Sequence, residues 1–208
     1  MLDHYILNNT ILNKAYSYVL FYNPSNSAPY HNFNHLLTVA KSCLEMATYY
    51  DLSDLDKETL VLSAIFHDFN HSAGLYKDDI NVPRALTALK DFCLKFEYPH
   101  FEKCQDIILA TFYPYNIATV DLTFVQKIIR DADMTQCLQI DWLQQCVFGL
   151  GKEFGISTYD SLTGQVAFLS NMQANTDWLQ MEFDIKLPAI LEDIKCLIKK
   201  AELVIISK

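Results

Sequence analysis

The scarcity of glycine is the feature that most restricts the fold of this chain. Only five of its 208 residues are glycine, whereas chains rich in β-strands usually need more glycine in their turns. Apolar residues recur three and four positions apart in several segments, and no segment shows convincing strand-type alternation. The sequence therefore predicts an all-α protein with a compact single-domain helical fold.

The apolar positions also predict where the helices lie. An N-terminal helix over residues 1–22 is followed by a loop at 23–29 that is rich in asparagine, serine and proline. Pro83 and Pro99 are expected in first helical turns, where proline is tolerated, and Pro188 should kink or delay the last helix. Further helices are predicted over residues 36–47, 56–68, 84–96, 101–112, 122–136, 141–154, 162–172 and 185–200.

The length suits a single domain over residues 1–208. Within it we expect the N-terminal helix at 1–22, a core at 30–175 and a C-terminal helical extension at 176–208. The sequence contains no internal repeat and no low-complexity tract. No separate sensory or regulatory domain is therefore expected within this chain.

The net charge restricts the partners that the chain can have. It carries 16 Lys and Arg against 25 Asp and Glu, a formal net charge of −9. Proteins that bind polymeric nucleic acid usually present a basic surface, so no such partner is expected. A small anionic substrate is compatible with this charge if a bound cation reverses the local field. No apolar run approaches the ~20 residues that cross a bilayer, so no membrane partner is expected either. These features leave the oligomeric state open.

The six cysteines indicate a reducing compartment. No two of them have the Cys-x-x-Cys spacing of zinc and redox motifs. Several, such as Cys43 and Cys93, lie among apolar residues at helical spacing, which is typical of buried reduced thiols. Because the N-terminus also lacks the features of a signal peptide, we expect a cytoplasmic location.

Four of the six histidines lie between positions 31 and 71, in two short motifs. The first is Tyr-His-Asn-Phe-Asn-His over residues 30–35, and the second is Phe-His-Asp-Phe-Asn-His over residues 66–71. His31 and His35 would share a helix face if the helix began that early. His67 and Asp68 are expected near a helix C-terminus, whose partial negative charge favours a nearby cation. Together they offer a nitrogen and a hard oxygen, a set that suits zinc, iron or manganese.

Two carboxylates in an apolar helix extend this set. Asp131 and Asp133 lie in the segment 129–134, where a buried carboxylate is costly unless it is paired or bound to a metal. Because they are two positions apart, they face different sides of a helix, and at most one is expected to bind the metal directly. The other could orient a histidine. The order His-x-x-x-His, His-Asp-x-x-His and then Asp is what predicts a metal site.

This order resembles the HD superfamily of metal-dependent phosphohydrolases, whose members are helical. Within that superfamily it is most similar to the catalytic domain of class I cyclic nucleotide phosphodiesterases, and the resemblance extends from about residue 30 to residue 168. The resemblance implies that Asp133, rather than Asp131, is the last metal ligand. The matching residues are Tyr30, His31, Asn32, His35, His67, Asp68, His71, Gly74 (one position late), Ala132 and Asp133.

A further match concerns the substrate. The family has a Gln-Val-Gly-Phe segment whose Gln hydrogen-bonds the purine and whose Phe stacks on it. The segment 164–168 resembles it, which implies that Gln165 and Phe168 bind a nucleotide base. The chain departs from the family at Asn70, Gln136 and Phe112, and it lacks a clear counterpart of one acidic residue between the His-Asp motif and the last ligand. These departures bear on the water shell of a second metal and on the choice of nucleotide.

The expected activity is hydrolysis of a 3′,5′-cyclic nucleotide to the 5′-monophosphate by metal-bound hydroxide. The resemblance implies two divalent ions, with zinc, manganese or iron at the tighter site and magnesium or manganese at the second. Asp68 would bridge the two ions and hold the hydroxide, and His31 would be the general acid. Tyr30 and His71 are expected to contact the substrate or its surrounding waters. The predicted ligands of the tighter site are His35, His67, Asp68 and Asp133.

Three other functions are compatible with the sequence. A different HD-type phosphohydrolase, acting on a nucleoside monophosphate or another small phosphate ester, would use the same ligands. A di-iron HD oxygenase would need further histidine ligands, for which only His71 and His100 are available. A non-catalytic nucleotide-binding domain is the third, and it is disfavoured because a metal site with an open position is usually catalytic.

Overall fold

The computed structural model describes residues 1–115 and 117–206, and helices are the regular secondary structure of that part of the chain, which contains no strand. The predicted all-α fold class is confirmed. The last two residues of the predicted C-terminal extension, 207 and 208, lie outside the described residues. The α-helices are α1 (Leu2–Asn8), α2 (Thr10–Tyr22), α3 (Phe33–Tyr49), α4 (Asp54–Phe66), α5 (Asp78–Lys95), α6 (Phe101–Leu109), α7 (Phe124–Met134), α8 (Leu150–Phe154), α9 (Thr158–Asn171) and α10 (Asp177–Ile206). Two 3₁₀ helices, η1 (Thr119–Asp121) and η2 (Thr135–Leu138), and a π-helix, η3 (Leu143–Gly149), lie between them.

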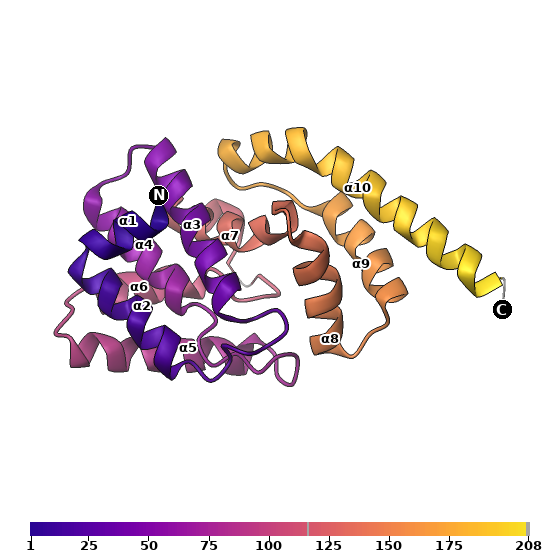
Figure 1. Cartoon of the computed structure of the whole chain (residues 1–208). Coiled ribbons are helices and arrows are strands. Elements are labelled where there is room, and N and C mark those ends of the chain that lie inside the picture. The colour runs from indigo at the N-terminus through magenta and orange to yellow at the C-terminus, as the bar shows by residue number, and fades with distance from the viewer. Residues whose placement is uncertain (116, 207–208) are drawn as a thin grey trace.

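The side chains form two hydrophobic clusters. The larger cluster contains buried residues from α1 to α7, and the smaller one contains residues from η2, η3, α9 and α10. Figure 1 shows the same division, with α1 to α7 gathered on one side and α8 to α10 on the other. Trp178, at the start of α10, packs against both clusters. The chain therefore crosses from one cluster to the other directly after α7, which carries two of the candidate carboxylates.

The N-terminal segment forms two helices instead of the single helix predicted. Asn9 is extended, with φ of −111°, and its Oδ1 accepts the backbone N–H groups of Ile11 and Leu12, both at 3.0 Å. An asparagine that caps a helix in this way satisfies donors that have no partner inside the helix. Asn9 therefore ends α1 and starts α2, a break that apolar periodicity alone does not reveal.

Two prolines lie inside helices that begin earlier than predicted. Helix α5 begins at Asp78, so Pro83 is in its second turn rather than its first, and the acidic pair Asp78 and Asp79 favours the earlier start. Helix α10 begins at Asp177 and continues through Pro188. Thr176 explains that early start, because its Oγ1 accepts the N–H of Leu179 at 3.3 Å. Pro188 thus does not delay the helix, and Figure 1 shows the axis of α10 changing direction along its length.

In the described part of the chain, no helix combines the length and the apolar character that crossing a membrane requires.

Candidate metal centre

His67 is held in a single ring orientation at the end of α4. It is the residue that follows Phe66, and its side chain is 1% exposed. Its Nδ1 lies 2.8 Å from the backbone oxygen of Ala64, to which it donates. The proton on Nδ1 leaves Nε2 with a lone pair, which is the arrangement usual for histidines that bind metals. The local fold of α4 therefore prepares His67 Nε2 as a ligand atom.

His35 enters the same centre from the first turn of α3. Asn32 caps this helix, because its Oδ1 accepts the N–H of His35 at 3.2 Å. The His35 side chain is 1% exposed, and its Nε2, like that of His67, has no hydrogen-bond partner among the described residues. His31 lies before α3 and not on it, so the two histidines do not share a helix face. Their rings are nevertheless neighbours, with centroids 5.8 Å apart.

Two carboxylates complete the cluster. Asp68 Oδ2 lies 3.3 Å from His35 Nε2 and 3.1 Å from His67 Nε2. Asp133 Oδ1, near the end of α7, lies 3.2 Å and 3.4 Å from the same two nitrogens. The Asp68 and Asp133 side chains are 17% and 28% exposed. The centre is therefore closed on its histidine side and open to solvent on its carboxylate side.

These four residues fit a metal ion. Their candidate ligand atoms all lie within 4.8 Å of one another. A tetrahedral ion with bonds of about 2.1 Å keeps its ligand atoms about 3.4 Å apart, and the four nitrogen–oxygen distances of 3.1 to 3.4 Å agree with that spacing. Two buried Nε2 atoms without hydrogen bonds would be costly unless something else binds them. A cation would satisfy both nitrogens and offset the repulsion between the two carboxylates.

The electrostatics of the four groups are mutually dependent. Burial opposes the charged form of His67, but the carboxylates of Asp68 and Asp133 outweigh burial and raise its pKa well above 6.5. The same carboxylates raise the pKa of His35 against burial. Burial opposes the ionised form of Asp133 too, yet the two histidines hold its pKa below the ordinary value. Burial likewise opposes the ionised form of Asp68, but His67, His31 and His35 hold its pKa well below the ordinary value, so both aspartates are ionised at neutral pH, the state in which they bind metals.

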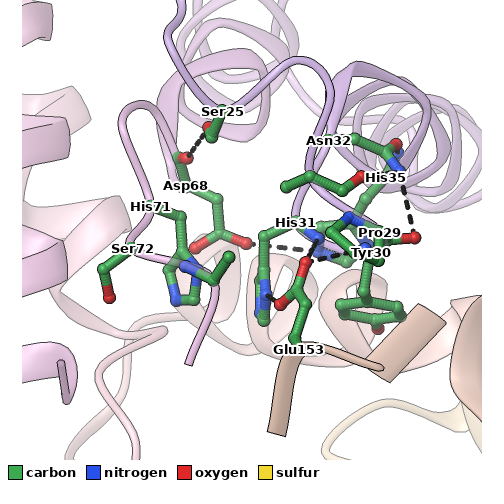
Figure 2. A network of polar contacts seen from close by, with 12 residues as sticks. Ser25, Pro29, Tyr30, His31, Asn32, His35, Asp68, His71, Ser72 and Glu153 are labelled. Carbon is green, nitrogen blue, oxygen red and sulfur yellow. Dashed lines mark hydrogen bonds and ion pairs between the residues drawn. The ribbon is translucent and has the colours of Figure 1, made fainter. Parts of the chain in front are cut away.

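Glu153 is the residue of this region that the sequence interpretation missed. It lies on α8, and its carboxylate accepts the backbone N–H groups of Tyr30 at 2.7 Å and His31 at 2.9 Å. Its Oε2 also lies 2.5 Å from His31 Nδ1, and Figure 2 shows Glu153 reaching across to this ring. Burial opposes ionisation of Glu153, but His31 and the two N–H groups hold its pKa below 4.5. A buried carboxylate thus fixes the His31 ring beside the metal centre.

Two close backbone contacts set the position of α8. Gly149 and Gly74 approach other segments so closely that an added Cβ would lie 2.6 Å from the Pro29 oxygen and 2.5 Å from the Glu153 oxygen, respectively. Gly74 also has φ of +86°, a conformation that favours glycine. These contacts join the loop before α3, the loop before α5 and α8. Glu153 reaches His31 because both glycines permit this approach.

His71 stacks on His31, with ring centroids 3.6 Å apart. Asn81 fixes its surroundings: Asn81 Oδ1 accepts the N–H of Ser72 at 3.1 Å, and Asn81 Nδ2 lies 2.9 Å from His71 Nε2. The N–H of Ala73 lies 3.2 Å from His71 Nδ1. Burial lowers the pKa of His71 to about 4 despite the charge of Asp68. His71 is therefore neutral at pH 7.

His31, His71 and Glu153 also bring three ligand-type atoms within 4.8 Å of one another.

Asp131 points away from the histidines. Its carboxylate accepts hydrogen bonds from the backbone N–H and side-chain amide of Asn175 and from the backbone N–H and hydroxyl of Thr176, at 2.6 to 3.1 Å. Asn175 and Thr176 directly precede α10. The alternative in which Asp131 orients a histidine is therefore wrong, because its oxygens are committed to the start of α10. Asp131 joins α7 to α10, while Asp133 faces the metal centre.

The predicted base-binding residues lie on α9. Gln165 is buried, and its Nε2 donates to the backbone oxygen of Cys146 at 3.3 Å. Phe168, one turn later, is 41% exposed. Tyr30 lies between this region and the metal centre: it packs against the smaller hydrophobic cluster, and its ring centroid is 4.7 Å from that of His35. The base-binding role of Gln165 and Phe168 stays a prediction.

Searches against protein-family models, curated proteins and solved structures found no match to this chain. The geometry of the centre is therefore what carries the functional interpretation.

Proposed function

We propose that the protein is a metal-dependent phosphohydrolase of small phosphate esters, and that a 3′,5′-cyclic nucleotide is its substrate. The observation that carries the proposal is the convergence of two buried, unpaired Nε2 atoms and two carboxylate oxygens on one point. A mixed nitrogen and oxygen set that opens to solvent on one side is typical of catalytic rather than purely structural metal sites.

Each side chain has a distinct role in this proposal. His35, His67 and Asp133 would hold one divalent ion, and Asp68 would contact that ion and a second one through its two oxygens. Metal ions at these positions would neutralise phosphoryl charge and make a water nucleophilic at neutral pH. The native metals would be zinc, manganese or iron at the first position and magnesium or manganese at the second.

His31 would protonate the leaving oxygen. Glu153 holds its Nδ1 at 2.5 Å, so Nε2 is the ring atom left to donate a proton to the substrate. A general acid that is fixed by a buried carboxylate loses little orientational freedom when the substrate arrives. His71, neutral and stacked on His31, would contact the waters of the second metal or, through one of them, the phosphate.

The choice of a cyclic nucleotide is supported by the resemblance of residues 30–35 and of Gln165 and Phe168 to the phosphodiesterase motifs. One observation favours a second candidate, a nucleoside monophosphate or another small phosphate ester. The Gln165 amide already donates to the Cys146 oxygen, so hydrogen bonding to a purine would require that this contact be shared or released.

Hydrolysis of cyclic AMP, cyclic GMP and a panel of nucleoside monophosphates, with added manganese or magnesium, tests the proposal. The wild-type chain is compared with Asp68→Ala and with Asp79→Ala, which removes an exposed carboxylate of α5. Turnover of cyclic nucleotides that is lost only in Asp68→Ala supports the proposal. Turnover of monophosphates alone favours the second candidate, and metal binding without turnover of any ester contradicts both.

A further inference from the structure

A second pocket lies on the other side of the turn that carries Asp68. Within residues 67–71, Asp68 and His71 face the metal centre, whereas Phe69 and Asn70 line a pocket of about 500 Å³ between α2 and α5. This volume is within the range of small-molecule sites in proteins. The pocket is therefore separate from the metal centre but shares a backbone segment with it.

One wall of the pocket is aromatic. Tyr18 and Tyr22 of α2 contribute rings whose centroids are 5.1 Å apart, and Tyr22 is 61% exposed. Phe69 and Ala88 also line the pocket and are nearly buried, with exposed fractions of 7% and 8%. The exposed Tyr22 ring, beside the nearly buried Phe69 and Ala88, is a surface on which a planar aromatic group can stack.

The opposite wall is a single face of α5 that carries charge. Arg84, Asp91 and Lys95 line the pocket at helical spacing, with Thr87 and Ala88 between them. In the described part of the chain, neither cation has a carboxylate within 4.0 Å. The Arg84 guanidinium lies 5.2 Å from the Tyr76 ring, and the Lys95 ammonium lies 5.5 Å from the Tyr22 ring. Because no carboxylate of the described residues holds either cation, both remain available to an anionic ligand.

Asn70 adds a polar group in a fixed position. It has φ of +59°, and its backbone N–H donates to Asn23 Oδ1 at 2.8 Å. Its side-chain amide lines the pocket and makes no hydrogen bond to any described residue. Asparagine adopts positive φ more readily than most residues, so the turn holds Asn70 in place and leaves its side-chain amide available to a ligand.

We propose that this pocket binds an aromatic monophosphate such as a nucleoside 5′-monophosphate. The aromatic ring would stack on Tyr22 beside Phe69, and the phosphate would bind Arg84, whose guanidinium matches two phosphate oxygens. Asp91 would accept hydrogen bonds from sugar hydroxyls, as acidic residues do in dinucleotide sites. The free amide of Asn70 is a further hydrogen-bonding group for the ligand. This inference does not depend on the activity proposed for the metal centre.

The test is calorimetric titration of AMP into the Asp68→Ala chain, in which the metal centre cannot contribute metal-dependent binding. Adenosine and inorganic phosphate are titrated as separate probes. We expect AMP to bind more tightly than either probe, and Arg84→Ala and Tyr22→Ala each to weaken AMP about tenfold. Lys90→Ala, on α5 but outside the pocket, is the matched control and should leave binding unchanged.

Photolabelling of the wild-type chain with 8-azido-AMP locates the site even if a variant folds poorly. Label on peptides that contain residues 18–22 or 84–95 supports the proposal. The proposal is overturned if AMP does not bind, if phosphate alone binds as tightly as AMP, if Arg84→Ala and Lys90→Ala have equal effects, or if the label lies only near the metal centre.

Discussion

Replacing Asp131 by alanine should destabilise the chain and leave its metal binding intact. The Asp131 carboxylate accepts hydrogen bonds from two donors of Asn175 and two of Thr176 and so joins α7 to the start of α10. Asp133, two positions later, faces the metal centre. The substitution therefore separates two roles that stand side by side in the sequence.

The expected loss follows from the burial of the donors. Thr176 is 6% exposed, so its N–H and hydroxyl would be left largely without water when the carboxylate is removed. A hydrogen bond to a charged group contributes about 1.5–3 kcal/mol, and Asn175, which is half-buried, can recover part of its loss from water. Counting only the two Thr176 donors, the free energy of unfolding should fall by about 3–6 kcal/mol.

Urea unfolding of the metal-free chain measures the loss of stability. Metal content after reconstitution shows whether the variant still binds metal. Asp131→Ala should unfold at a lower urea concentration than wild type, and at urea concentrations below this unfolding transition it should still bind metal. Asp133→Ala is the matched variant and should lose the metal while the chain remains folded. The reasoning is refuted if Asp131→Ala loses its metal while folded, or if its free energy of unfolding changes by less than about 1 kcal/mol.

Three further predictions follow from the contacts around the centre. Glu153→Gln should lower kcat about 10- to 100-fold with metal content unchanged, because the His31 ring loses its charged partner; kinetics beside metal analysis check this, and loss of metal would contradict it. Gly149→Ala should lower kcat and the melting temperature together, because its Cβ would lie 2.6 Å from the Pro29 oxygen; an unchanged melting temperature would contradict the contact. The charged His67 ring is favoured only in the folded state, so His67 stabilises the metal-free chain most at low pH. The free energy of unfolding should therefore fall as pH rises from 6.5 through the raised pKa of His67. Urea unfolding across this pH range measures the change, and a rise in the free energy of unfolding would refute the prediction.

The metal centre was predictable because its ligands carry local signals. His67 and Asp68 are adjacent, and they directly follow α4, which ends at Phe66, two residues before the predicted end of that helix. His35 directly precedes another predicted helical region, and Asp133 lies in an apolar helix where an unpaired carboxylate would be costly. The structure brings ligand atoms of all four within 4.8 Å of one another.

Glu153 was not predictable by the same reasoning. It is separated from His31 by 122 positions, and in the sequence it is one of many acids on a predicted helix. Its contact depends on where α8 lies, and two close backbone approaches at Gly74 and Gly149 determine that position. Long-range packing of this kind leaves no periodic pattern in the sequence. Because the chain has only five glycines, Gly74 and Gly149 were nevertheless a usable signal of close backbone approaches.

The predicted helix boundaries were wrong where a side chain caps a helix at a position that the apolar periodicity does not indicate. Asn9 split the N-terminal helix by capping α2, and Thr176 started α10 ahead of the predicted position. Pro83 was expected in a first helical turn and lies in the second turn of α5, and Pro188 was expected to kink or delay the last helix but does not delay it. Apolar spacing identifies which segments are helical, whereas capping contacts, some of them made with distant residues, decide where each helix begins.

The most direct test of the central claim is the metal content of the purified chain after equilibration with manganese or zinc and removal of excess ion. Wild type and Asp79→Ala should each retain about one equivalent or more of tightly bound metal, and His67→Ala should retain almost none. Retention by His67→Ala equal to that of wild type, or no retention by wild type, would contradict the assignment of His35, His67, Asp68 and Asp133 as a metal centre.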